Sequence, residues 1–580
     1  MKPWHLGNTT VRSPFRLREG LVALSTSSLQ GNLRGQDIAF RVLLGEHGIV
    51  SLGEDVTNSV GRKWRSALGK MGFLYPEIPD VSGLNQTDLG QVDTITPNGW
   101  RLICASTVPA MQECFLRALS AHYIPSILEK NFDFSVFSPL RHTLSIMLEL
   151  ERQSGDSRLN FIEMASIVQL TNGSDDIKCI ASTILDFRSR REKQNINKRK
   201  FDTNVLNELA LTVLKQNGKP YEAQTFKDYA DTNIRYIKAT GLVQSRGRGI
   251  SLTPEKHLFI EKLIQEVHIP ESVNAYFITL CNGAILPTDN RDSALAVLED
   301  LLIQLNNRGI SFDISTRTIN TSADIEIIRH EIENILALKN EEEYADKQAL
   351  EWEEIAAYMD LISARKSRKI LKNGEIIEIP QAEAPAYFEW VLWRAFLAIN
   401  SLANKPYEAR RFKVDQDFLP VGTAPGNGPD LVFEFDEFVL VVEVTLTTNS
   451  RQEAAEGEPV RRHVANLVTA YQEKSGKQVY GLFIANKIDS NTAETFRIGI
   501  WFTNNDDEMK LEIIPVTLIQ FKGFFEAMFK SQHICINLIR ELLEECGVLR
   551  SKFKAPAWKS EIEKTVQQNI DRLFATQYSE

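Results

Sequence analysis

The sequence predicts a multidomain α+β protein with a largely helical N-terminal half, a charged helical linker and a C-terminal α/β domain. The 580 residues are too many for one hydrophobic core. Helical apolar spacing dominates the N-terminal half, whereas Val-rich, strand-like runs are concentrated after residue 430. We therefore expect domains over residues 1–130, 131–300 and 385–580, joined by a helical linker over 301–384.

Composition excludes several classes of protein. The apolar fraction of 43% and the charged fraction of 24% are ordinary for a soluble globular chain. Without a run of 18 apolar residues or a signal-peptide pattern, we expect neither a membrane-spanning nor a secreted protein. The six cysteines form no C-x-x-C pair, which argues against a zinc site and favours a reducing cytoplasm. The net charge of -10 argues against unspecific polyanion binding but permits a basic face for DNA.

Basic residues gather in the first 80 positions, including Arg62, Lys63 and Arg65. Residues 35–44 and 61–68 have helical apolar spacing, and an apolar run ending at Leu74 follows the second helix and its glycines. A short helix, a glycine and a strand are typical of a winged-helix module, so we expect one here. The alternative is an Arg-rich helix face in solvent.

Residues 136–200 are predicted to form three helices. A basic run ends the third helix and continues to Lys200. This run could contact phosphates, or it could be a solvated helix end.

Residues 221–262 give the clearest winged-helix pattern. A helix over 225–239 is followed by a strand over 242–245, a basic turn over 246–249 and a return strand over 250–252. The candidate DNA contacts of this segment are Arg235, Arg246 and Arg248. The alternative is a hairpin that ends in a polar turn.

The stretch from about residue 324 to 372 is highly charged. It holds the acidic run Glu341–Glu343 and the basic run from Arg365 to Lys369. We expect it to be a helical linker that spaces two working halves.

The C-terminal domain is built around a predicted hairpin over residues 426–445. A Gly-rich turn leads to Asp430 and a strand, and a second strand of Val and Leu ends near Glu443. A lone carboxylate in a central strand costs several kcal/mol, so two of them brought together by a hairpin favour a bound cation. Oxygen ligation by Asp430 and Glu443 suits Mg²⁺ beside a phosphate. The alternative is an acidic turn with a strand-end Glu paired to a basic residue.

The elements that flank the hairpin add three more polar groups. A nearly all-apolar helix over 387–402 carries Glu389, which could instead be a capping or ion-paired acid. A helix over 451–472 holds Glu456 and His463, with Pro459 at a first-turn position. Strands over 479–485 and 513–516 and two final helices, over 538–545 and 560–574, complete the predicted α/β domain.

With these pieces assembled, the hairpin resembles the PD-(D/E)xK nuclease core, and the chain resembles the AlwI-like type IIS restriction endonucleases, a group that includes nicking enzymes. The resemblance is carried by the motifs Phe388-Glu389-Trp390-x-x-Trp393, Leu419-Pro420-Val421, Gly426-Asn427-x-Pro429-Asp430, Glu443-Val444-Thr445 and Glu456-x-Glu458-Pro459-Val460-x-Arg462-His463. Thr445 stands where the general nuclease motif has a lysine. Weaker similarity extends over most of the chain.

The resemblance implies a winged-helix DNA-recognition half, a helical linker and a C-terminal cleavage domain that uses Mg²⁺. It implies hydrolysis of DNA phosphodiester bonds a short distance from an asymmetric site, in the cytoplasm of a bacterium. The implied active-site positions are Glu389, Asp430, Glu443, Glu456 and His463, with metal ligation by Asp430, Glu443 and the backbone carbonyl of Val444. Double-stranded DNA is the expected partner, together with a transient dimer or a separate small cleavage subunit.

Two other functions compete with this interpretation. A sequence-specific DNA-binding protein with an inactive nuclease domain should have lost at least one acid, yet all five positions are present. A glycosidase with paired carboxylates would need an aromatic sugar cleft, and it would leave the basic N-terminal modules unexplained.

Overall fold

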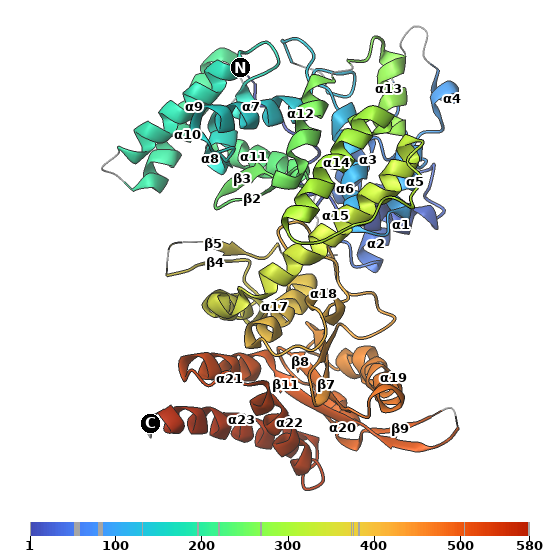
Figure 1. Cartoon of the computed structure of the whole chain (residues 1–580), viewed down its shortest axis with the longest axis vertical. Coiled ribbons are helices and arrows are strands. Elements are labelled where there is room, and N and C mark those ends of the chain that lie inside the picture. Colours follow the sequence, from blue (N-terminus) through green and yellow to red (C-terminus); the bar gives the residue numbers. More distant parts are fainter. Residues whose placement is uncertain are drawn as a thin grey trace. The chain divides into compact units, whose positions relative to one another are not determined.

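The computed structural model of the chain describes residues 2–50, 59–78, 85–129, 132–193, 197–217, 221–266, 269–372, 374, 376–380, 383–503 and 505–577. The chain divides into two compact units, residues 1–336 and 337–580 (Figure 1). The division falls within the range 301–384, where we expected a linker. The mixed α+β class expected from the sequence is confirmed.

The beginning of unit 1 is helical. Its helices are α1 (Arg16–Ser25), α2 (Asp37–Glu46), α3 (Val60–Lys70), α4 (Gln86–Leu89), α5 (Pro97–Cys104) and α6 (Val108–Ala121). The two helices expected over 35–44 and 61–68 are therefore present as α2 and α3. The strand expected after Gly72 is wrong, because Leu74 makes only one antiparallel bridge, to Ile95. Pro76 follows closely and has no N–H to extend a ladder.

The second part of unit 1 combines helices with a small antiparallel sheet. The elements are α7 (Pro139–Ser154), β1 (Leu159–Asn160), α8 (Phe161–Ser166), η1 (Val168–Leu170), α9 (Ile177–Glu192), α10 (Lys198–Asn217), α11 (Ala223–Lys238), β2 (Val243–Ser245), β3 (Gly249–Leu252), η2 (Pro254–Lys256), α12 (His257–Gln265), α13 (Val273–Asn282), η3 (Pro287–Asp289) and α14 (Arg291–Asn307). The order helix, strand, basic turn, strand expected over 221–262 is present as α11, β2 and β3. The strand order of the sheet is β1-β3-β2.

The charged stretch after residue 321 is only partly helical. It forms α15 (Ser322–Ala345), η4 (Gln348–Glu351) and α16 (Trp352–Ser363), followed by the antiparallel hairpin β4 (Arg368–Ile370) and β5 (Ile376–Glu378). The prediction of helix up to residue 372 is therefore wrong for the part after α16. Isoleucines favour strands, and Gly374, with a φ of 82°, accommodates the turn between them.

Unit 2 is built on one mixed sheet. In the described part of the chain the sheet has four strands in the order β11-β8-β7-β6. They are β6 (Leu431–Glu434), β7 (Phe438–Thr445), β8 (Gln478–Ala485) and β11 (Glu512–Thr517). The β6–β7 pair is the expected hairpin, and β7, β8 and β11 run parallel to one another.

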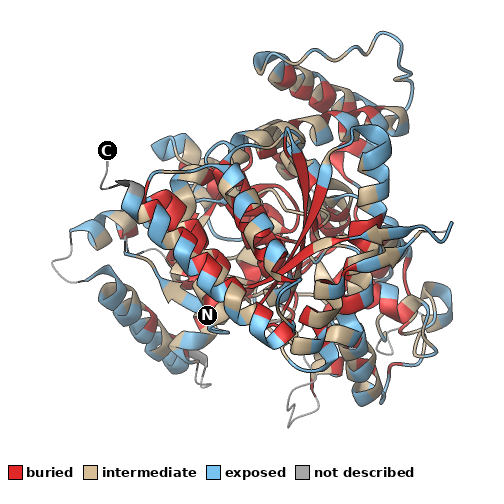
Figure 2. Cartoon of the chain, turned by 90° about the horizontal axis from the view of Figure 1, so that it is seen from below, coloured by how far each residue is buried: buried red, intermediate tan, exposed pale blue. Residues whose placement is uncertain are grey.

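Helices cover both faces of this sheet (Figure 1). One core contains residues of α16, α17 (Ala384–Ile399), α21 (Leu518–Lys530), α22 (Ile536–Leu549) and α23 (Ala555–Gln577) against Leu440 and Val442 of β7. The other contains residues of α19 (Glu458–Lys474) and α20 (Ser490–Ile498) against Val439 and Val441. Figure 2 shows the buried residues, in red, on the strands and on the inward sides of the helices. Helix α16 lies within the expected linker range and packs into this core.

Smaller elements complete unit 2. They are α18 (Pro406–Ala409), a π-helical turn η6 (Glu453–Gly457) that leads into α19, and the hairpin β9 (Ile500–Phe502) with β10 (Glu508–Lys510). The sequence analysis missed this hairpin together with α18, α20 and α21. Among the described residues of both units, no helix is long and apolar enough to cross a membrane.

Candidate active site

The β6–β7 hairpin brings Asp430 and Glu443 together. Leu431 pairs with Val442 in an antiparallel register, so Asp430, one residue before β6, continues opposite Glu443 on β7. The Asp430 Oδ2 atom accepts a hydrogen bond of 2.9 Å from the backbone N–H of Val444. This bond fixes the carboxylate at the open end of the hairpin.

Strand alternation turns Glu443 and Thr445 toward α19. Val439 and Val441 pack into the core that contains α19, and residues two apart on a strand share a face. His463 on α19 lies on that face, and its Nδ1 atom is 2.6 Å from the Glu443 Oε1 atom. Both side chains are buried, with 6% and 8% of their area exposed. Among the described residues the other ring nitrogen of His463, Nε2, is buried without a hydrogen-bond partner.

Glu456 reaches the site from the π-helical turn η6. Such turns insert an extra residue into a helix and are frequent at functional sites. The Thr445 hydroxyl donates a hydrogen bond to the Glu456 carboxylate, and the charge of Glu456 also acts on Asp430 and Glu443. Thr445 therefore orients an acid of this group.

Glu389 comes from the buried helix α17 on the opposite face of the sheet. Only 5% of this residue is exposed, and its Oε2 atom accepts a hydrogen bond of 2.7 Å from the backbone N–H of Ala424. Burial and the charge of Asp430 raise the pKa of Glu389 well above its ordinary value. The five residues expected at the active site thus meet at the end of the β6–β7 hairpin.

The electrostatics of this group indicate a missing positive charge. Burial, followed by the charge of Glu443, raises the pKa of Asp430 well above its usual range. Burial also raises the pKa of Glu443 to about 8 and raises the pKa of Glu456. Carboxylates that hold their protons this strongly release them when a cation binds. The oxygen-only donor set fits a hard divalent cation such as Mg²⁺.

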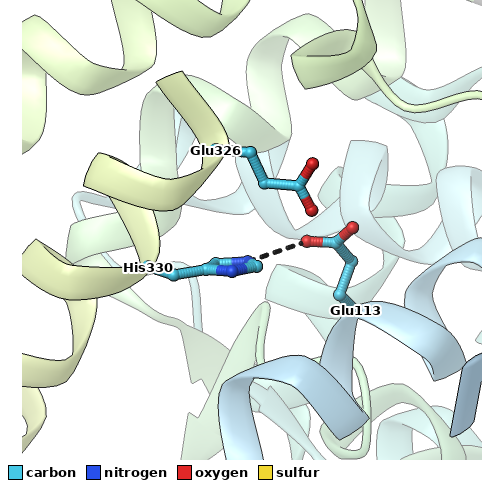
Figure 3. A group of neighbouring side chains, drawn as sticks. All are labelled: Glu113, Glu326 and His330. Carbon is cyan, nitrogen blue, oxygen red and sulfur yellow. Dashed lines mark hydrogen bonds and ion pairs between the residues drawn. The ribbon is translucent and has the colours of Figure 1, made fainter. Parts of the chain in front are cut away.

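A second group of metal-ligand side chains lies in unit 1. Glu113 on α6 and Glu326 and His330 on α15 place ligand atoms within 4.8 Å of one another (Figure 3). Arg329 and Arg117 already donate to Glu113, at 2.8 and 2.9 Å. Burial opposes its charge, but hydrogen bonds from His330 and Arg329 hold the pKa of Glu113 well below its usual range. This group is therefore a balanced ion-pair network that fastens α15 to α6.

The basic residues expected to contact DNA are all in unit 1. They lie on α3 (Arg62, Lys63 and Arg65), on α11 (Arg235) and at the β2–β3 turn (Arg246 and Arg248). Several of them form ion pairs within the unit: Arg65 with Asp93 at 2.6 Å, Arg235 with Asp231 at 3.0 Å and Arg246 with Asp156 at 2.9 Å. Arg62 and Arg248 are exposed. Their contact with DNA stays a prediction.

One charged residue near the acids was missed by the sequence analysis. Arg411 acts electrostatically on both Glu443 and His463. The signal for it was the basic pair Arg410-Arg411 before the Gly-rich turn, which is too short to distinguish from an ordinary surface pair.

Comparison with known proteins identifies the family. A family model described as AlwI restriction endonuclease matches residues 69–524. The chain belongs to the AlwI restriction endonuclease family. The matched range includes every candidate active-site residue. The resemblance and the enzyme class expected from the sequence, a type IIS site-specific deoxyribonuclease, are confirmed, and the function is DNA cleavage by a restriction enzyme. No curated protein matches the chain.

Three solved structures show further similarity to this AlwI-family chain. The small subunit of the heterodimeric restriction endonuclease R.BspD6I is 27% identical over 37% of this chain and 98% of its own, with a TM-score of 0.28. The BpuJ1 endonuclease binding domain, solved with modified DNA, is 14% identical over 43% of this chain and 85% of its own, with a TM-score of 0.28. The restriction endonuclease FokI is 11% identical over 94% of this chain and 99% of its own, with a TM-score of 0.26.

Proposed function

We propose that this AlwI-family enzyme hydrolyses DNA with Mg²⁺, a short distance from an asymmetric recognition site, in a PD-(D/E)xK nuclease domain within unit 2. The observation that carries the proposal is the meeting of Glu389, Asp430, Glu443, Glu456 and His463 at the open end of the β6–β7 hairpin. The raised pKa values of these acids support a site that is built to receive a cation.

Asp430, Glu443 and the backbone carbonyl of Val444 are the proposed metal ligands. The bond from the Val444 N–H to Asp430 sets the carboxylate beside this strand end. A bound Mg²⁺ would supply Lewis-acid charge at the scissile phosphate. Glu389 and Glu456 border the same position and would orient water or hold a second ion.

His463 is the proposed proton acceptor. When Glu443 is ionised, the Nδ1–H group of His463 donates to it across the 2.6 Å contact. This hydrogen bond fixes the tautomer and leaves the Nε2 lone pair free to take a proton from the attacking water. Burial and the charge of Arg462 lower the pKa of His463, which favours the neutral ring.

Unit 1 is proposed to recognise the DNA sequence. Its helix α3 carries Arg62, Lys63 and Arg65, and the α11–β2–β3 segment follows the winged-helix order, with Arg246 and Arg248 at the wing. Phosphate contacts from such residues set the register on the duplex, and base contacts in the groove set the sequence. We propose residues 1–130 and 131–300 as recognition subdomains, 301–384 as the connection and 385–580 as the cleavage domain.

The number of strands cut depends on the partner. One hairpin site hydrolyses one phosphodiester, so a double-strand break requires a transient dimer or a separate small cleavage subunit. The R.BspD6I protein compared above is the small subunit of a heterodimeric restriction endonuclease. In a heterodimer of that kind, this chain would be the large subunit and would nick DNA when alone. We propose the cytoplasm of a bacterium as the setting.

Incubation of the purified chain with supercoiled plasmid, in Mg²⁺ or in EDTA, tests the proposal. Discrete ends that map at a constant offset from one asymmetric sequence, in Mg²⁺ only, are the expected result. Linear product would indicate cleavage of both strands, and open circles would indicate nicking. Specific, salt-sensitive DNA binding without cleavage in Mg²⁺ would contradict the proposal and favour an inactive nuclease domain.

A further inference from the structure

Arg411 is placed in line with the active-site acids by the pairing of the chain before the Gly-rich turn. Arg410 forms an antiparallel bridge with Leu431, the first residue of β6. Continuing that register by one residue sets Arg411 opposite Asp430, just as the β6–β7 register sets Asp430 opposite Glu443. Arg411, Asp430 and Glu443 therefore form one row across the sheet.

Side-chain alternation puts this row on one face. The Arg410 guanidinium packs on the other face, where it pairs with Glu341 at 2.6 Å and lies over Trp393. Leu431 packs in the same core as Trp393. Arg411 therefore points to the face of Glu443 and His463, and its charge lowers the pKa of both groups.

The turn before Asp430 contacts the guanidinium of Arg411 and helps to position it. Its Nη2 atom donates a hydrogen bond of 2.8 Å to the Asn427 side chain. A Cβ atom on Gly428 would stand 1.6 Å from Nη1, so a side chain at residue 428 would push this guanidinium out of its present position. The half-buried arginine is thus held at its guanidinium by Asn427, and its charge lies on the side of the acids.

The site needs such a charge because Thr445 cannot supply one. Hydrolysis of a phosphodiester puts extra negative charge on the phosphate oxygens in the transition state, and a preorganised cation stabilises that charge. Guanidinium suits this role, because its planar donors match phosphate oxygens and it stays protonated. In the described structure Lys477 pairs with Glu434, toward the other end of the β6–β7 hairpin from Glu443, so it cannot fill the role.

We propose that Arg411 binds the scissile phosphate and provides the positive charge that a lysine gives in the general nuclease motif. This inference rests on the proposed function. In the reaction the water oxygen forms the new P–O bond and gives its proton to His463. The P–O3′ bond breaks with its electron pair on the 3′ oxygen, which takes a proton from solvent. Arg411 exchanges no proton and acts through charge and hydrogen bonds.

The first test compares single-turnover cleavage by Arg411→Gln and Arg411→Lys. Loss of one positioned donor should slow cleavage by about 100-fold in Arg411→Gln, and the lysine variant should recover to within about tenfold of the unaltered chain. Arg540→Gln is the matched control, since Arg540 pairs with Glu437 at the other end of the hairpin. Thermal stability should be unchanged in all three variants, and DNA affinity in Ca²⁺ should fall far less than the cleavage rate in Arg411→Gln, which loses one of many phosphate contacts.

Gly428→Ala gives a second test that keeps the arginine. The new methyl group displaces the guanidinium tip, and Gly428 is not in the left-handed region, so the backbone tolerates alanine. Cleavage should fall about tenfold or more. Added to Arg411→Gln, the same change should have no further effect, because both act through one side chain.

Three outcomes would overturn the role of Arg411. They are unchanged cleavage by Arg411→Gln, full additivity of Gly428→Ala with Arg411→Gln, and loss of Mg²⁺-induced thermal stabilisation in Arg411→Gln, which would show a purely structural role at the metal ligands. Measuring Asp430→Asn in the same experiment distinguishes failure of the Arg411 proposal from failure of the proposed function. If Asp430→Asn is inactive while Arg411→Gln is fully active, the site stands and only the arginine is excluded.

Discussion

Glu443 lies on the buried face of β7, between Asp430 and His463, with 8% of its side chain exposed. Its environment favours the neutral carboxyl group, since burial raises its pKa to about 8. A cation bound to Asp430 and Glu443 would reverse this preference, because the charged form would then be compensated. The residue is thus poorly suited to stabilising the metal-free chain, which is typical of a site selected for activity.

Glu443→Gln should make the metal-free chain less sensitive to alkaline pH. Because the pKa of Glu443 is about 8 in the folded chain and 4.5 ordinarily, the folded state binds an extra proton between these values, and stability falls as the pH rises through about 8. The difference in Tm between the glutamine variant and the unaltered chain should therefore grow in favour of glutamine from pH 5 to pH 9. A constant difference across that range, measured in EDTA, would contradict this.

His463→Gln should slow cleavage by about 100-fold or more, because general base catalysis contributes that much. The rate should fall at acid pH because protonation of the His463 ring removes the base. This fall, the acid limb of the pH–rate profile, should disappear in the glutamine variant. In Arg462→Gln the limb should instead move to higher pH, since Arg462 lowers the pKa of His463. Single-turnover rates from pH 5 to 9 give both profiles. An acid limb that persists unchanged in His463→Gln would exclude the assignment.

Helix α19 must lie close to the sheet for His463 to reach Glu443. Gly481 on β8 makes this possible, because a Cβ atom there would stand 3.0 Å from Val464 of α19 and 2.9 Å from Ile513 of β11. The absent side chain of a strand residue thus allows the close approach of the helix that carries His463. Glycine in a strand often marks such a close approach of neighbouring elements.

Gly481→Ala should lower both stability and activity. Overpacking costs typically 1–3 kcal/mol, and the shift of α19 lengthens the contact between His463 and Glu443. Gly523→Ala is the matched control. Its added Cβ atom would meet Ile570 at an ordinary 3.4 Å, and alanine is the better helix former in α21. Denaturant unfolding and cleavage rates measure both effects. If the two alanines behave alike, close packing at Gly481 has no special role.

At the level of elements, the sequence predicted the parts with strong periodic or turn signals. The β6–β7 hairpin and β8 follow from Val-rich runs with a turn between them, and α11, β2 and β3 follow from helical spacing and a basic Gly turn. Helix α21 was missed although Lys522, Glu526 and Lys530 form an ion-paired polar stripe at i,i+4 spacing. Gly523 and the phenylalanines around it weaken the helix signal in the middle of the segment. The meeting of Arg411 with the acids depends on long-range pairing, which no local pattern contains.

At the scale of the whole molecule, the proposed function assigns recognition to one unit and chemistry to the other. The acids proposed for the active site all belong to residues 337–580, and the basic residues proposed for DNA contact belong to residues 1–336. With a net charge of -10, we expect DNA affinity to depend on the local basic surfaces of unit 1 and binding to be salt-sensitive. It also follows that a change in the acid cluster should affect cleavage without removing binding.

The most direct test measures cleavage, DNA binding and thermal stability of Asp430→Asn side by side. We expect cleavage in Mg²⁺ to fall about 1,000-fold or more, and affinity for the recognised DNA to stay within about threefold. The Tm in EDTA should rise, because a buried carboxyl group with a raised pKa is removed, and the further rise on adding Mg²⁺ should be lost. Cleavage by Asp430→Asn at the rate of the unaltered chain would contradict the central claim that this hairpin is the active site.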